Sequence, residues 1–147
     1  MNIIRATTEH TDLISPLFDL YRQFYKAEAN LEASRQFIFD RLSNNESVIF
    51  LALDNDKAIG FVQLYPLFAS VALKSLWLLN DLYVDESARK LGVGEELMHT
   101  AENFAKETNA RGLFLRTATD NFPAQKLYEK CGWVRDEQFY RYDLILK

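Results

Sequence analysis

The chain has 147 residues, of which 48% are hydrophobic, 14% aromatic and 26% charged, and its formal net charge is −4. This length suffices for one domain with a sizeable core, so we expect a single domain over residues 1–147, and the aromatic content excludes an intrinsically disordered chain. A net negative charge gives nucleic acid no general attraction and mildly favours a cationic substrate.

The N-terminal third of the chain predicts one strand followed by two helices. Residues 2–6 (NIIRA) are typical of a short strand, and residues 9–26 place apolar side chains at helical spacing. Pro16 lies early enough in that helix to be tolerated. A second helix over residues 32–43 stops at Asn44 and Asn45, and either of them could be its left-handed cap.

In the middle of the chain the apolar period changes to two. Residues 47–53 and 57–68 are apolar runs around the turn sequence DNDK, which predicts a hairpin, and a third run follows at 71–85. We expect these three strands to be neighbours in meander order. An amphipathic helix then extends from Val93 to about Lys106.

The C-terminal part predicts a strand at residues 112–118, a short helix at 123–132 that is closed by Gly132, and a final strand at 138–146. The whole order predicts an α/β fold in which a mixed sheet has helices on both faces. No internal repeat or low-complexity segment interrupts it.

Nothing in the sequence indicates a leader, a membrane segment or a metal site. The first residues lack a basic stretch followed by an apolar one, and no apolar run approaches the roughly 20 residues of a membrane span. We therefore expect a cytoplasmic protein that binds no membrane. Cys131 is the single cysteine, and His10 and His99 are far apart, so no metal-ligand spacing exists. No histidine is near Cys131 in sequence, which favours a buried structural thiol over a nucleophile.

The segment ARKLGVGEEL carries the clearest chemical signal. Gly92 and Gly94 let backbone amides approach a ligand without an intervening Cβ, and the helix that follows has unpaired N–H groups and a positive dipole at its start. Arg89 and Lys90 add cations that suit phosphate oxygens. The alternative is a tight turn with solvated cations. The spacing is neither a P-loop nor the three-glycine dinucleotide fingerprint.

Two motifs together resemble the GNAT superfamily of N-acetyltransferases. Arg89-x-x-Gly92-x-Gly94, between the strand LNDLYVD and an amphipathic helix, resembles the Arg/Gln-x-x-Gly-x-Gly/Ala signature of that superfamily. Downstream, NFPAQKLYEKCGW is similar to its second cofactor motif, Asn-x-x-Ala-x-x-x-Tyr. The resemblance covers nearly the whole chain. It implies the GNAT fold, with a mixed, mostly antiparallel central sheet of six to seven strands, about four helices, and a splay at the cofactor site.

The resemblance also implies which residues hold acetyl-CoA as co-substrate. Amides of the glycine turn would bind its pyrophosphate, and free backbone groups of the strand before the turn would pair with pantetheine. The implied cofactor-binding residues are Leu82, Tyr83, Val84, Arg89, Lys90, Leu91, Gly92, Val93, Gly94, Asn121, Ala124 and Tyr128.

The catalytic roles implied by the resemblance fall on Tyr128, Asp81 and Asn80. Tyr128 would lie beside the thioester sulfur, where it either donates its proton or only stabilises the thiolate, because a phenol of pKa ~10 faces a thiol of pKa ~8.5. Strand alternation places Asp81 and Tyr83 on one face and Asn80 on the other unless a bulge shifts the phase. Related small-amine acetyltransferases often read Glu-Asp where Asn80-Asp81 stands here. Asp81 could relay a proton through water, hold the substrate ammonium, or serve as a structural cap.

The acceptor groove implied by the resemblance lies between the N-terminal helices and the sheet. Aromatic faces and carboxylates suit a cationic aliphatic amine. Core or dimer contacts are an equally good interpretation of these aromatic residues. The candidate acceptor residues are Tyr21, Phe24, Tyr25, Glu28, Glu32 and Tyr65.

The resulting functional hypothesis is an acetyl-CoA-dependent N-acetyltransferase. It would acetylate a primary amine of a small molecule, such as a polyamine or an amino acid, by direct attack in a ternary complex. One alternative is acetylation of a protein lysine or N-terminal amine. Another is a non-catalytic module that binds acetyl-CoA as a regulatory ligand. The aromatic C-terminal run FYRYDLIL is compatible with a homodimer.

Overall fold

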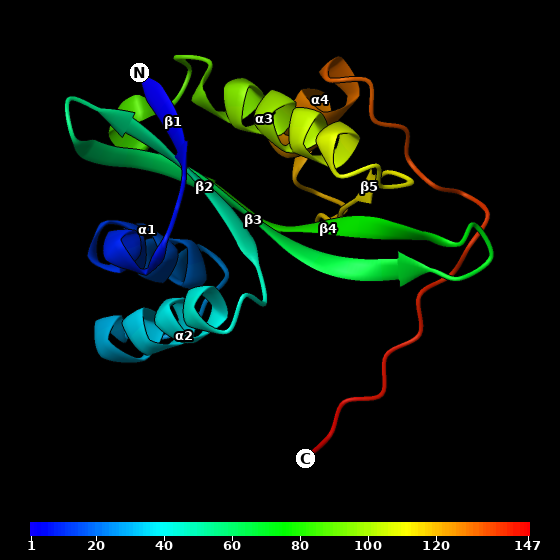
Figure 1. Cartoon of the computed structure of the whole chain (residues 1–147), viewed down its shortest axis with the longest axis horizontal. Coiled ribbons are helices and arrows are strands. Elements are labelled where there is room, and N and C mark those ends of the chain that lie inside the picture. Colours follow the sequence, from blue (N-terminus) through cyan, green and yellow to red (C-terminus); the bar gives the residue numbers. More distant parts are fainter. The chain divides into compact units, whose positions relative to one another are not determined.

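Five strands form one sheet in the order β1-β2-β3-β4-β5 in the computed structural model, which describes residues 1–147. β1 to β4 are antiparallel neighbours, and β5 runs parallel to β4. Asn55 and Asp56 join β2 to β3 with φ angles of 49° and 68°, which is typical of a tight hairpin turn. The predicted hairpin and meander order are confirmed. The strands, shown in Figure 1, are β1 (Asn2–Arg5), β2 (Val48–Asp54), β3 (Lys57–Ala69), β4 (Lys74–Val84) and β5 (Leu113–Phe114).

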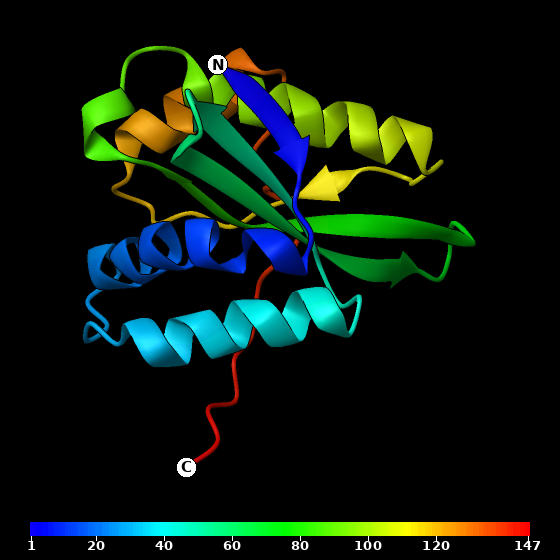
Figure 2. The same ribbon diagram turned by 60° about the vertical axis from the view of Figure 1, so that its left-hand side comes forward.

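Four α-helices accompany the sheet, as predicted. Figures 1 and 2 show α1 and α2 beside each other on one face of the sheet and α3 on the opposite face. Asn45, just after α2, has a φ of 54° and is the left-handed residue expected there. The helices are α1 (Thr11–Phe24), α2 (Leu31–Ser43), α3 (Val93–Glu107) and α4 (Phe122–Lys130), with short 3-10 turns η1 (Thr8–His10) and η2 (Glu86–Ala88).

The sheet face beneath α1 and α2 carries an apolar core that ends in polar side chains. Ile14, Ile38 and Phe61 are completely buried there, and the Phe18 ring lies edge-on to Phe61 at 6.2 Å between centroids. Residues two apart in a strand share a face, so Gln63, two residues after Phe61, also points toward α1. Gln63 is fully buried. A polar site therefore begins where the core ends.

The start of α3 lies very close to β3 at Gly60. A Cβ at this position would be 3.1 Å from the carbonyl oxygen of Tyr83 and 3.2 Å from Cγ1 of Val93. These distances are shorter than most Cβ contacts, so glycine eases this approach. This close packing places the first turn of α3 directly against β3.

Two compact units make up the chain, residues 1–116 and 117–147. The first contains the sheet with α1, α2 and α3, and the second contains α4 and the segment after it. The single domain expected over residues 1–147 stays a prediction.

The expected number of six to seven strands was wrong, because the sheet has five. The strand predicted at residues 112–118 is reduced to Leu113–Phe114, and residues 138–146 form no strand. Large side chains in that last segment are 81% to 91% exposed, so no neighbouring strand covers them. Alternation shows that a segment can lie on a sheet, but strand formation also requires a partner edge. The exposed residues are Phe139, Tyr140, Tyr142, Leu144, Ile145 and Leu146.

Asp19 fastens the connection between α1 and α2. It is 6% exposed and accepts hydrogen bonds from Ser34 Oγ at 2.6 Å, Arg22 Nη1 at 2.9 Å and the backbone N–H of Asn30 at 3.1 Å. Burial alone would raise the pKa of Asp19, but the hydrogen bonds from Ser34 and Asn30 and the charge of Arg22 more than offset it, so the pKa is lowered. The carboxylate therefore orders the loop that follows Tyr25.

We expect Asp19→Ala to lower the free energy of unfolding by about 2–3 kcal/mol at pH 7, because it removes the acceptor of the buried Ser34 hydroxyl and of two partly buried donors, on Arg22 and Asn30. Since the folded pKa lies below the unfolded one, the stabilisation is present above the ordinary carboxyl pKa and is lost as the pH falls through the folded value. Urea unfolding measured from pH 7 down to pH 2 would show this. Asp12→Ala is the matched control: Asp12 also joins α1 to α2, through Arg35, but its side chain is 78% exposed. Equal losses for the two variants would contradict this role of Asp19.

Candidate active site

A β-bulge interrupts the pairing of β3 and β4 at Asn80. Gln63 lies opposite Asp81 and Leu64 lies opposite Leu79, so Asn80 is the extra residue. A bulge bends its strand and re-aims the neighbouring side chains. Here the shift brings the side chains of Asn80 and Asp81 into contact, Nδ2 to Oδ1 at 3.0 Å. The phase shift that the sequence left open is thus present.

The Asp81 carboxylate is buried at the end of the core and held by polar side chains. It is 4% exposed, and Gln63 Nε2 donates to Oδ2 at 2.6 Å while Ser47 Oγ donates to Gln63 Oε1 at 2.8 Å. Burial raises the pKa of Asp81, and the hydrogen bonds from Gln63, Tyr21 and Asn80 offset part of that rise. A carboxylate whose pKa is raised toward neutrality is a better proton acceptor than an exposed one.

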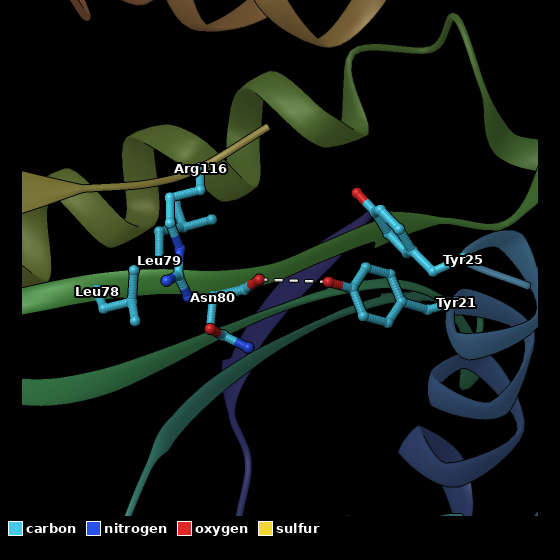
Figure 3. Close-up of a pocket in the computed structure, with 6 residues that line it drawn as sticks. All are labelled: Tyr21, Tyr25, Leu78, Leu79, Asn80 and Arg116. Atoms are coloured by element: carbon cyan, nitrogen blue, oxygen red, sulfur yellow. Dashed lines mark hydrogen bonds between the residues drawn. The ribbon is translucent and has the colours of Figure 1, made fainter. Parts of the chain in front are cut away.

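A pocket of about 230 Å³ opens beside Asn80. Figure 3 shows the rings of Tyr21 and Tyr25 facing Asn80 and Arg116 across it, with the Tyr21 hydroxyl donating to the Asn80 carbonyl at 3.3 Å. The Tyr21 hydroxyl also contributes to the hydrogen bonding of Asp81, so it stands between the pocket and the buried carboxylate. The lining residues are Tyr21, Tyr25, Leu78, Leu79, Asn80 and Arg116.

The pairing of β4 with β5 ends at the strand residues that line this pocket. Their pairing stops at Leu78 opposite Phe114. The Asp85 N–H donates to the Ile59 carbonyl at 2.8 Å, which makes these two a hydrogen-bonded pair. Because such pairs alternate along antiparallel strands, Leu82 and Val84 point their N–H and C=O groups away from β3. These are the two residues expected to present free backbone groups at a splay, although the Val84 carbonyl accepts from Arg89 Nε at 3.0 Å.

The glycine turn has a left-handed backbone at two positions. Lys90 and Gly92 have φ angles of 66° and 81°, both left-handed. Gly92 is the N-cap of α3 and has no side chain to cap it, so the first amides of the helix have no carbonyl partner inside the helix. A Cβ at Gly92 would meet nothing within 4 Å, so the turn faces open space. Leu91 is exposed, whereas Val93 is buried and anchors the helix.

The other predicted acceptor and cofactor residues of the first unit lie around this site. The Tyr83 ring contacts Tyr21 at 6.3 Å and has the Arg89 guanidinium 5.5 Å from its centroid. Phe24 is 56% exposed and meets the Tyr25 ring at 5.2 Å. Tyr65, on β3, lies opposite Leu78 of β4. Burial and the charge of Asp81 raise the pKa of Tyr65 to about 12. Glu28 is exposed, and its backbone carbonyl accepts from Arg22.

The second motif forms α4 in the second unit. Asn121 is its N-cap and accepts from the Ala124 N–H at 3.3 Å, which explains the spacing of these two motif residues. Tyr128 lies in the last turn of α4, with its ring 6.3 Å from that of Trp133. Cys131 is the C-cap residue and is half-buried. The catalytic and cofactor roles of these residues stay predictions.

Sequence reasoning missed Ser47, Gln63 and Arg116. Each is a polar residue at the start of or inside a mostly apolar run, SVIFLAL, KAIGFVQLYPLF or GLFLRTA. A polar side chain at a core-facing position of a strand needs a partner, and that signal could have drawn attention to Gln63. Nothing local indicates that Ser47, Gln63 and Asp81 meet.

No group of three or more His, Cys, Asp or Glu side chains is arranged to hold a metal ion. None of the helices has both the length and the apolar character needed to cross a membrane.

Comparison with known proteins identifies relatives over the whole length. The family model described as "Acetyltransferase (GNAT) family" matches residues 14–133. An uncharacterized N-acetyltransferase, YhfO of Bacillus subtilis, is 42% identical over 98% of this chain and 97% of its own. A crystal structure of a probable acetyltransferase has 46% identity and a TM-score of 0.95, and covers 100% of this chain and 99% of that one. A D-amino-acid N-acetyltransferase of Saccharomyces cerevisiae is 33% identical over 62% of this chain and 58% of its own.

Proposed function

This chain belongs to the acetyltransferase (GNAT) family, and on that premise we propose that it transfers the acetyl group of acetyl-CoA to a primary amine of a small molecule. The observation that carries the proposal is the buried Asp81 network beside a polar pocket, on the strand that leads into the glycine turn. The amine would attack the thioester directly in a ternary complex.

The residues at the turn and the splay fit the cofactor. Amides of Leu91 to Gly94 would hold the pyrophosphate, with Arg89 and Lys90 as additional cations, because the helix start offers aligned N–H groups and positive charge. The outward backbone groups of Leu82 and Val84 would pair with pantetheine. Acetyl-CoA itself supplies an activated acyl carbon.

Asp81 and its neighbours supply the acid-base chemistry in this proposal. An ammonium ion cannot attack, so the acceptor must first lose a proton, and the Tyr21 hydroxyl provides a path from the pocket to Asp81. The raised pKa of Asp81 favours that uptake. The backbone N–H of Leu82 would stabilise the carbonyl oxygen, and Tyr128 would donate a hydrogen bond or its proton to the departing sulfur.

The pocket beside Asn80 accommodates a small acceptor. A volume of about 230 Å³ holds a molecule of amino-acid or diamine size. The yeast relative is named for D-amino acids, which supports the same class. Relatives that are N-alpha-acetyltransferases, among them one from Schizosaccharomyces pombe, keep the protein-directed alternative in view.

The test is thiol release from acetyl-CoA with a panel of acceptors, namely spermidine, diamines, free amino acids, aminoglycosides and a lysine-rich peptide, from pH 6 to pH 10. The proposal predicts turnover with a small amine that rises with pH as the amine loses its proton. Turnover with the peptide alone would favour the protein-directed alternative. Tight binding of acetyl-CoA without release above hydrolysis would favour the regulatory module.

We also propose that the protein is a homodimer. Arg141 Nη2 and Asp143 Oδ1 pair at 2.9 Å, so these two side chains lie on the same side of the segment. Tyr140, Tyr142 and Leu144 are then on or near the other side, each at least 88% exposed. A second copy carries the same apolar segment, and a two-fold arrangement lets each copy cover the other's.

Sedimentation at micromolar concentration should therefore show a dimer for the natural chain and a monomer for the double variant Tyr142→Asp, Leu144→Asp. The control is Arg141→Gln, on the polar side of the segment, which should remain dimeric. A natural chain that sediments as a monomer would refute the dimer.

A further inference from the structure

Arg116 is the charged residue in the lining of the pocket beside Asn80. It follows β5 by two residues, and Figure 3 shows its side chain running alongside Leu79 with the guanidinium reaching toward Asn80. No carboxylate of the chain lies within 4.0 Å of it as an ion-pair partner. A guanidinium without a carboxylate partner thus faces the space where the acceptor is proposed to bind.

We propose that Arg116 binds a carboxylate group of the acceptor, so that the preferred acceptor is a small amino acid rather than a polyamine. This inference rests on the proposed acetyltransferase function and specifies its substrate class. Arg116 is then a specificity residue that acts on substrate binding.

The shape of the guanidinium supports a carboxylate ligand. Its planar fork of N–H donors matches the two carboxylate oxygens and gives short, charge-assisted hydrogen bonds. Phosphate groups also suit arginine, but the amides and cations proposed for the cofactor phosphates belong to the turn at residues 89–94. A molecule with one carboxylate and one amine matches the Arg116 guanidinium and the buried Asp81.

Charges at the site favour an acceptor with both signs. Asp81 lies behind Tyr21 and Asn80 and attracts an ammonium group, whereas Arg116 lines the pocket itself. A polyamine would bring a second ammonium group into the pocket that Arg116 lines. Two positive charges in one pocket repel each other. An amino acid places one charge of each sign between these two residues. The local charges therefore outweigh the weak preference for cations that the net charge of −4 suggests.

Matched pairs of acceptors that differ only in the carboxylate give the sharpest test. Thiol release is measured with lysine against cadaverine and with phenylalanine, in both enantiomers, against phenethylamine. The variants are Arg116→Gln and Arg116→Lys, and the control is Arg111→Gln, an exposed cation just before β5 that does not line the pocket.

For Arg116→Gln we expect kcat/KM to fall about 10- to 100-fold for the amino acid, mainly through KM, with little change for the decarboxylated amine. Arg116→Lys should restore part of the loss, and Arg111→Gln should change neither acceptor. The proposal is overturned if the natural enzyme prefers the decarboxylated members, if both members lose equally, or if the loss appears in the KM of acetyl-CoA.

These outcomes separate the inference from the function on which it rests. Efficient acetylation of cadaverine or phenethylamine with poor acetylation of the amino acids leaves the function intact and refutes the role of Arg116. If no acceptor is acetylated, the proposed function fails. Calorimetric titration of lysine and phenylalanine then decides the inference on binding alone: binding by the natural chain but not by Arg116→Gln supports it, and any other result refutes it.

Discussion

Replacing Asp81 with asparagine is expected to lower kcat by about 10²- to 10⁴-fold, the usual contribution of a positioned proton acceptor. The asparagine keeps the shape of the side chain but cannot take up a proton. The Gln63 amide can turn over, so that its oxygen accepts from the new asparagine amide and its nitrogen donates to the Ser47 hydroxyl. The fold should therefore persist. Steady-state thiol release with saturating amine measures the effect.

The pH profile gives the same prediction a second readout. Burial raises the pKa of Asp81, and the active form is the carboxylate, so kcat of the natural enzyme should fall as the pH drops through that raised pKa. The variant should lack this acidic limb. Asp54→Asn, at the exposed end of β2, is the control and should behave as the natural chain. A variant of Asp81 with turnover within twofold of the natural enzyme and an unchanged profile would remove Asp81 from the mechanism.

Gly92→Val should weaken acetyl-CoA binding by about 100-fold or more. The φ angle of 81° is strained for any residue with a Cβ and most of all for a β-branched one, so the turn must change conformation. The open space around Gly92 means that this loss comes from the backbone and not from a steric clash. Misaligned amides then lose charge-assisted hydrogen bonds to phosphate, each contributing about 1.5–3 kcal/mol. Isothermal titration with coenzyme A measures the affinity.

Two further variants protect this prediction from a folding artefact. Gly92→Ala should show a smaller loss, because alanine tolerates the left-handed region better than valine does. Gly112→Ala, where φ is not positive and nothing lies within 4 Å of the added Cβ, should bind as the natural chain does. Melting curves for all variants show whether the fold survives. Unchanged affinity in a folded Gly92→Val protein would mean that the phosphates bind elsewhere.

Most of the fold could be predicted because its elements carry strong local periods. The helices at 11–24 and 93–107 and the hairpin around Asn55 follow from apolar spacing and turn residues. The strand expected at 138–146 shows the limit of this reasoning. Its alternation is real, but a strand forms only against a partner edge, and sequence periodicity does not specify which edge.

The candidate site divides in the same way. The glycine turn could be proposed as a cofactor site because its residues are consecutive, and Asp81 and Asn80 could be proposed because they lie on the strand that leads into it. The bulge that unites Asn80 and Asp81 could not be predicted, since it depends on the register with β3. Gln63 reaches the site from β3 and Arg116 from the segment after β5, so their proximity to Asp81 depends on tertiary structure.

A crystal structure with coenzyme A and the best acceptor of the panel would test the account most directly. We predict pyrophosphate oxygens within hydrogen-bond distance of the amides of Leu91 to Gly94, and the acceptor nitrogen in the pocket between Tyr21 and Asn80. A pyrophosphate bound away from this turn, or an acceptor outside the pocket, would contradict it.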